Sequence, residues 1–240
     1  MSIRIVGLTG LPEVRPGDDL AALIRSASGP LDAATIVVIA QKVVSKAENA
    51  IVDLRTVTPS DLAAAWASQY GKDPRLIELV LCQSRRIVKM DRGVIISETS
   101  HGFVAANAGV DQSNVPGEHF ATILPADPDE SARRIRESVG CAAVIISDTF
   151  GRPWREGLVN VAIGVSGLEP LLDLRVTVDR CGRPLQTSTI AIADELAAAA
   201  GLVMGKSDGI PVALITGFAS KTGEISAKVL ARAPEKDLFR

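Results

Sequence analysis

Short apolar runs alternate with polar segments along the chain, and the lengths of these runs are typical of β-strands. The runs are rich in Val and Ile and are bounded by Gly, Pro, Asp or Asn, which favours strands over long buried helices. The predicted strands comprise residues 1–6, 36–40, 50–54, 86–90, 94–97, 121–124, 142–146, 158–165, 171–178, 185–190 and 212–215.

Polar capping residues mark the starts of several helices between these strands. Asp18 is expected to cap a helix that extends to Ser28, and Thr58 to cap a helix over residues 62–70 with Pro59 in its first turn. Asp-Pro pairs begin two more helices, over residues 75–83 and from residue 127 to 139, and the alanine-rich run 193–204 predicts another.

Two glycine-containing segments, residues 90–94 and 179–183, predict tight hairpins. Hairpins require antiparallel pairing, whereas helices between other strands allow parallel crossovers. The sequence therefore predicts an α+β fold with mixed, largely antiparallel sheets and Ala-rich helices. With 240 residues, we expect residues 1–240 to form a single domain of two closely packed lobes.

Two segments have little strand or helix pattern. Residues 98–119 are rich in Gly, Asn and Ser, and a loop of that length in a compact domain is usually functional. Residues 218–240 form a polar C-terminal segment, and we expect the tail from Pro234 to fray.

Composition limits the cellular locations and the classes of binding partner that we expect for the protein. Hydrophobic residues make up 47% of the chain but aromatic residues only 3%, so Val, Ile, Leu and Ala must form the core. The formal charge is −2, from 26 basic and 28 acidic residues, which gives no footprint for nucleic acid or an anionic membrane. No signal peptide, membrane-spanning run or disulfide pattern is recognisable, so we expect a cytoplasmic protein.

The run that follows predicted strand 142–146 has the densest set of reactive side chains. It contains Asp148, Thr149, Arg152 and Arg155. Carboxylate and hydroxyl oxygens suit magnesium or manganese, and the arginines could hold an anionic substrate. The alternative is an Asp-capped turn with two surface arginines.

Two other segments offer charged groups to the same site. Asp111 lies three residues before Asn114, the spacing of an Asx-type turn. The alternative is that Asp111 shares a metal ion with Asp148 across a cleft. Lys46 lies in residues 41–49, which we interpret as a turn after a strand, where a lysine either neutralises phosphate or is simply solvated.

At these segments the chain resembles the coenzyme F-420-0:L-glutamate ligase (γ-glutamyl ligase) family. The matching blocks are residues 10–14, 41–48, 111–114, 146–157, 164–167, 193–197 and 209–212. They occur in family order over nearly the whole chain. The resemblance implies a ligase domain alone, without the C-terminal reductase domain that some relatives carry, and an interlocked homodimer.

The resemblance also implies a reaction. GTP would activate the carboxylate of a deazaflavin coenzyme F-420 precursor as an acyl phosphate, and the amine of L-glutamate would displace the phosphate, with further glutamate additions as an extension. A divalent metal, magnesium or manganese, would assist, with a second ion and a monovalent cation such as potassium also compatible. A metal-dependent phosphoryl hydrolase and a non-catalytic nucleotide-binding module are the alternatives.

Residue roles follow from the same blocks. Asp111 and Asp148 would bind one divalent ion and Thr149 a second, with Lys46 and Asp148 catalytic. Arg152 and Arg155 are our own candidates for substrate anchors. The residues that would contact GTP are Leu11, Pro12, Glu13, Val14, Gln41, Lys46, Asn114, Met204, Gly205, Lys206, Ser207, Asp208, Gly209, Ile210 and Pro211.

Two residues depart from the family pattern. Gln41 stands where a small hydroxyl residue is expected, and Lys206 stands where many relatives carry an acidic or amide oxygen ligand. Asp208 is a candidate replacement for that ligand. The second metal position therefore has weaker support than the first.

Overall fold

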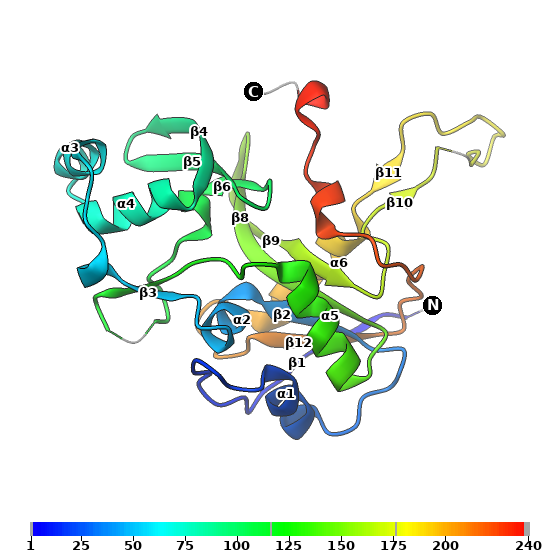
Figure 1. Cartoon of the computed structure of the whole chain (residues 1–240). Coiled ribbons are helices and arrows are strands. Elements are labelled where there is room, and N and C mark those ends of the chain that lie inside the picture. Colours follow the sequence, from blue (N-terminus) through cyan, green and yellow to red (C-terminus); the bar gives the residue numbers. More distant parts are fainter. Residues whose placement is uncertain (1, 116, 176, 238–240) are drawn as a thin grey trace.

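A five-stranded sheet forms the centre of the fold in a computed structural model that describes residues 2–115, 117–175 and 177–237 (Figure 1). Strands β2 and β8 run parallel, and each other neighbouring pair runs antiparallel. Both strands are rich in buried Val and Ile, as expected for strands covered on two faces. The strand order is β1 (Arg4–Gly7), β12 (Val212–Thr216), β2 (Ile36–Ala40), β8 (Ala143–Arg152) and β9 (Arg155–Ser166).

Helices cover both faces of this sheet. Helices α1 (Leu20–Ser28) and α5 (Pro128–Val139) pack against each other, and α5 lies in front of the sheet in Figure 1. Helix α6 (Ile192–Met204) lies behind the sheet and contacts β1, β8, β9 and β12. Their apolar sides and the sheet form the larger hydrophobic cluster.

A second hydrophobic cluster lies on the left of Figure 1. The chain enters this part through β3 and leaves it through β7, which pair antiparallel. The elements around the cluster are β3 (Ile51–Asp53), the 3₁₀ turn η1 (Leu54–Thr56), α3 (Asp61–Tyr70), α4 (Pro74–Cys82), β4 (Ser84–Asp91), β5 (Val94–Thr99), β6 (Val104–Ala106), the 3₁₀ turn η2 (Asn107–Gly109) and β7 (Phe120–Thr122). The division of one domain into two lobes stays a prediction.

The predicted α+β class with largely antiparallel sheets is confirmed. The helices that begin at Asp73-Pro74 and Asp127-Pro128 are capped by those aspartates, and the 90–94 hairpin joins β4 to β5. In the described part of the chain, no helix is both long and apolar enough to cross a membrane.

Two helix caps differ from the prediction. Asp19 caps α1 by accepting a hydrogen bond from Ala22 N, because the Asp18 carboxylate instead accepts one from Arg15 N in the preceding turn. Ser60, not Thr58, caps α3, and its hydroxyl also donates to Glu78 of α4. In both places several capping residues lie together, and tertiary contacts select one.

Two predicted assignments, a pair of strands and a long loop, differ from the structure. The apolar runs at 171–178 and 185–190 form only the short strands β10 (Leu172–Asp173) and β11 (Thr189–Ile190), with an isolated bridge between Val178 and Pro184. Residue 176 lies outside the described residues. Residues 98–119 form part of β5, then β6 and η2, rather than one continuous loop. Beyond Gly217 the chain forms 3₁₀ turns at Ala227–Leu230 and Pro234–Lys236, and residues 238–240 lie outside the described residues, so fraying of the tail stays a prediction.

Candidate functional site

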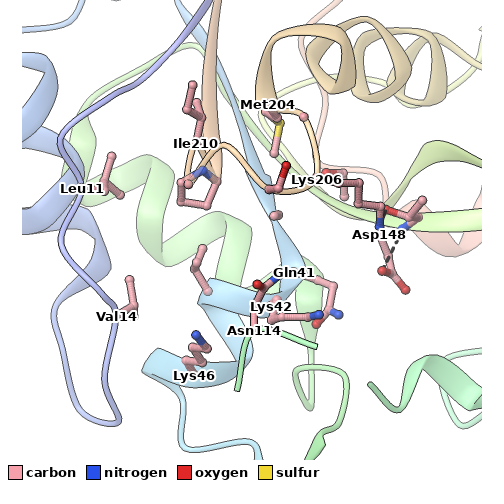
Figure 2. A pocket seen from close by; sticks show the side chains of 18 of the residues that line it. Leu11, Val14, Gln41, Lys42, Lys46, Asn114, Asp148, Met204, Lys206 and Ile210 are labelled. Carbon is pink, nitrogen blue, oxygen red and sulfur yellow. Dashed lines mark hydrogen bonds between the residues drawn. The ribbon is translucent and has the colours of Figure 1, made fainter. Parts of the chain in front are cut away.

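A pocket of about 330 Å³ opens where β2 ends and β8 continues, a volume typical of small-molecule sites. Strand β2 pairs with β8 only as far as Ala40, opposite Ser147, and the chain then enters helix α2 (Gln41–Ala47). Figure 2 shows side chains entering this space from the Leu11–Val14 loop, α2, the 111–114 loop, β8 and the 204–211 turn. Most of the predicted site residues line this one pocket.

Strand β8 does not end at Ile146, as the sequence predicted, but extends through Asp148 and Thr149 to Arg152. The residues of β8 beyond Ile146 are mostly polar, so the apolar run that predicted the strand ends before the strand does. The register between β8 and β9 shifts at Ile146 and Ser147, a β-bulge. Bulges re-aim side chains, and this one directly precedes Asp148.

Helix α6 stabilises the bulge. Ala162 N–H of β9 donates to Asp194 Oδ1 at 2.9 Å, so a carboxylate in the first turn of α6 satisfies an amide at the register shift. Burial raises the pKa of Asp194, against the lowering effect of the Ala162 hydrogen bond. The family block 193–197 thus contains a residue that holds the strand beside Asp148.

Asp148 is partly buried and faces the pocket. Its Oδ1 accepts a hydrogen bond from Thr149 N at 2.8 Å, and no described residue donates to its Oδ2. Burial raises the pKa of Asp148; the Thr149 hydrogen bond and the charge of Lys206 oppose that rise, and the charge of Asp111 adds to it. An anionic Asp148 therefore favours a cation in the pocket.

The Thr149 hydroxyl has two partners. Its Oγ1 lies 3.1 Å from Asn160 Oδ1 on β9 and 3.0 Å from Lys206 Nζ. Because lysine is only a donor, Oγ1 accepts from Lys206 and donates to Asn160. The turn that follows α6 is thereby joined to the strand that carries Asp148.

Asp111 enters the pocket from the opposite side. Its Oδ1 accepts from Ser113 N at 2.7 Å, the Asx-type turn that its spacing allowed, while Oδ2 accepts from Lys42 Nζ at 2.6 Å. Burial opposes the ionisation of Asp111, but the hydrogen bonds from Lys42 and Ser113 outweigh it and lower its pKa. The structural and functional interpretations of Asp111 are therefore compatible.

Residues 41–49 form a helix, α2, over most of their length rather than the predicted turn. The helical spacing places Lys42 and Lys46 on one face, and both line the pocket. Lys46 Nζ lies 2.5 Å from Glu13 Oε1, and the lysine side chain is only 5% exposed whereas that of Glu13 is 63% exposed. The buried ammonium of Lys46 is therefore paired with an exposed carboxylate that an anionic ligand could displace.

The departure at Gln41 has a structural explanation. Gln41 is buried, and its Oε1 accepts from Ser45 Oγ at 2.8 Å one turn later on α2. The side chain is thus fixed at the pocket floor by its own helix.

The remaining wall is mostly apolar. Leu11, Pro12 and Val14 face Met204, Ile210 and Pro211 across the pocket, as Figure 2 shows for the labelled members. Ala40 N donates to Pro211 O at 2.8 Å, which joins the end of this turn to the start of α2. The pocket therefore combines an apolar side with three lysines and three carboxylates, those of Glu13, Asp111 and Asp148.

Three predicted site residues do not line this pocket. Arg152 and Arg155 lie exposed at the tip of the β8–β9 hairpin, and their role as anchors stays a prediction. The Asp208 carboxylate occupies the space that a Cβ on Gly205 would need. The lining residues without a predicted role are Ala40, Lys42, Val43, Ser147 and Asn160.

Asp111 and Asp148 are the carboxylates of this pocket that could hold a divalent ion. Both carboxylates line one pocket, and the charge of Asp111 raises the pKa of Asp148. Magnesium is commonly held by one or two carboxylates and several waters, so two carboxylates suffice. No group of three or more His, Cys, Asp or Glu side chains that could hold a metal occurs among the described residues.

Comparison with known proteins gives the family. Residues 9–217, which include every pocket-lining residue, match the family described as F420-0:Gamma-glutamyl ligase. The chain belongs to this F420-0:gamma-glutamyl ligase family. The family match thus covers both sides of the pocket.

Three curated relatives of the chain are each named coenzyme F420:L-glutamate ligase. The protein of Methanothermobacter thermautotrophicus is 48% identical over 100% of both chains. The Methanopyrus kandleri protein is 45% identical, with 95% of this chain and 94% of the relative covered. The Methanocaldococcus jannaschii protein is 41% identical, with 99% and 97% covered. The similarity to these gamma-glutamyl ligase family members therefore extends over whole chains.

Replacement of Asp194 tests its support of the bulge. Asp194→Ala leaves the buried Ala162 N–H without its acceptor, and we expect a loss of about 1–3 kcal/mol of unfolding free energy. Asp194→Asn keeps an acceptor oxygen. Urea unfolding at pH 7 measures both variants.

The raised pKa of Asp194 determines whether Asp194→Asn raises or lowers the unfolding free energy at pH 7. The folded state holds the proton more tightly than the unfolded state, so stability from protonation is present at low pH and is lost as pH rises through the folded pKa. At pH 7 the wild type carries the cost of the ionised carboxylate, and we expect Asp194→Asn to be at least as stable. Equal destabilisation of both variants would contradict the assignment.

Proposed function

We propose that this chain is a GTP- and divalent-metal-dependent ligase that joins L-glutamate to the carboxylate of a deazaflavin coenzyme F420 precursor. Membership of the F420-0:gamma-glutamyl ligase family and the printed names of its relatives support the reaction. The observation that carries the proposal is one pocket in which Asp111 and Asp148 lie with Lys42, Lys46 and Lys206.

The different chemistry of the two sides of the pocket suits a bound nucleoside triphosphate. The apolar side formed by Leu11, Val14 and Ile210 suits the base and ribose, whereas the lysine side suits the phosphates. Lys46 is held as a nearly buried point charge, which needs no large side-chain reorganisation to meet a phosphate oxygen. Glu13, its present partner, is mostly exposed and can turn to solvent.

Asp111 and Asp148 would hold the divalent ion, and that ion, when bound, would neutralise phosphate oxygens and polarise the transferring group. Lys42 already neutralises one oxygen of Asp111, so it holds this carboxylate ionised and oriented. The Thr149 amide orients Asp148 through Oδ1 and opposes the effect of burial, which raises the pKa of Asp148.

The reaction proceeds in two steps in this proposal. A carboxylate oxygen of the precursor attacks the γ-phosphorus of GTP, the bond to the β-phosphate oxygen breaks, and GDP leaves. The glutamate amine then attacks the acyl carbon, loses a proton, and inorganic phosphate departs as the amide forms. The lysines stabilise charge on the phosphates during the transfer.

Mass spectrometry of the products is the direct test. The deazaflavin precursor is incubated with GTP, L-glutamate and manganese, and we expect mass increments of one or more glutamate residues with one GDP formed for each. GTP turnover that is independent of glutamate and precursor would instead favour a metal-dependent phosphoryl hydrolase. Tight GTP binding without turnover would favour a nucleotide-binding module.

Several features implied by the family resemblance stay predictions. These are the homodimer, the monovalent cation and extension by more than one glutamate; the cytoplasmic location expected from composition also stays a prediction. Gel filtration with light scattering measures the first of these, and product masses measure the extension by glutamate.

Replacement of Asp148 tests the metal assignment. Asp148→Asn keeps the shape of the side chain but removes the anionic oxygen, and we expect kcat to fall by at least about 100-fold, at or beyond the range for residues that only support a metal ligand. The assay measures product at saturating manganese. Asp91→Asn makes the same chemical change at the exposed β4–β5 hairpin and should change kcat little. Activity of Asp148→Asn at the wild-type level would remove Asp148 from the metal site.

Replacement of Lys46 tests the phosphate assignment. Loss of a hydrogen bond to a charged group costs about 1.5–3 kcal/mol, so Lys46→Ala should lower kcat/KM for GTP by about 10–100-fold. Lys89→Ala removes a lysine that is 68% exposed on β4 and serves as the matched control. An unchanged kcat/KM for GTP in Lys46→Ala, with native circular dichroism, would exclude Lys46 from GTP binding.

A further inference from the structure

Lys206 lies where the family resemblance places the second divalent ion, beside Thr149. Its Nζ donates to Thr149 Oγ1 at 3.0 Å, and within the described ranges no carboxylate forms an ion pair with it. The positive charge of Lys206 also acts on Asp148. A cation that belongs to the protein thus already lies against the hydroxyl proposed as a metal ligand.

A divalent ion on the same oxygen would be crowded by this ammonium. The ion would lie about 2.1 Å from Oγ1. Because Nζ lies 3.0 Å from Oγ1, the two cations would then be within about 5 Å of each other. The single Thr149 proton is directed to Asn160 Oδ1, and one of the two lone pairs of the oxygen already accepts from Lys206.

The backbone keeps Lys206 at this position. Helix α6 ends at Met204, and Lys206 follows two residues later in the 204–211 turn. The helix packs closely on β9, because a Cβ on Gly201 would lie 2.9 Å from Asn160 Nδ2. Asn160, Thr149 and Lys206 therefore form one hydrogen-bonded set between β9, β8 and the turn.

No alternative ligand completes a second site there. The Asp208 carboxylate, which the sequence suggested as a replacement, is packed under Gly205 and does not line the pocket. The residues near Thr149 thus hold the Lys206 ammonium and do not offer the ligands that a second divalent ion would need.

We infer that the ε-ammonium of Lys206 replaces the second divalent ion at Thr149, so that this chain binds one divalent ion, at Asp111 and Asp148. This inference rests on the proposed function for the first ion. Lys206 is then a positioning residue whose positive charge lies on the side of the pocket where the γ-phosphate is transferred.

The number of bound Mn²⁺ ions tests this inference. Titration of the full chain with Mn²⁺ alone, with free ion measured by electron paramagnetic resonance, should give one equivalent for the wild type. Lys206→Glu removes the ammonium and supplies a carboxylate oxygen, and we expect two equivalents. Lys206→Arg keeps a cation and should stay at one equivalent.

Each other outcome has a distinct meaning. Two equivalents in the wild type, or one equivalent in Lys206→Glu, would overturn the replacement by Lys206 while leaving the first metal site intact. No bound Mn²⁺ in the wild type would overturn the metal site of the proposed function as well. Lys206 is exposed, so its variants should fold, and their thermal midpoints are measured alongside.

Discussion

The unequal lengths of β2 and β8 are the constraint on which the site depends. The two strands pair in parallel until Ala40 and Ser147, after which β2 turns into α2 and β8 continues with β9 alone. From Asp148 onward one edge of β8 is therefore open to the pocket rather than hydrogen-bonded to a neighbour. Helix α2, the 111–114 loop and the 204–211 turn all meet at that edge.

The regular parts of the fold were predictable because local chemistry determines them. The Asp-Pro helix starts at residues 73 and 127, and the glycine hairpin between β4 and β5, carry their signals within a few residues. The extension of β8 was not recognised, because its residues beyond Ile146 are mostly polar and lack the apolar run that marks the buried part of the strand. Helix α2 was missed because it has seven residues and no side-chain cap at Ala40.

Several charged residues of the site could be recognised from the sequence, but the residues that form hydrogen bonds or ion pairs with them could not. Asp111, Asp148 and Lys46 were predicted from charge and resemblance, and they line one pocket. Lys42 and Asn160 were missed, because Lys42 faces the pocket only in a helical conformation and Asn160 meets Thr149 only through strand pairing. Such contacts follow from tertiary structure and leave no mark in a single sequence.

Helix α6 acts as a spacer of fixed length between two parts of the site. Asp194 holds its first turn to the β9 bulge, and Lys206 follows its last residue and contacts Thr149. At 1.5 Å per residue the 13 residues of the helix span about 20 Å. A single-residue insertion within α6 would rotate everything after it by about 100°, since a helix has 3.6 residues per turn. Natural variants of this chain should therefore tolerate substitutions on the exposed side of α6 but not changes in its length.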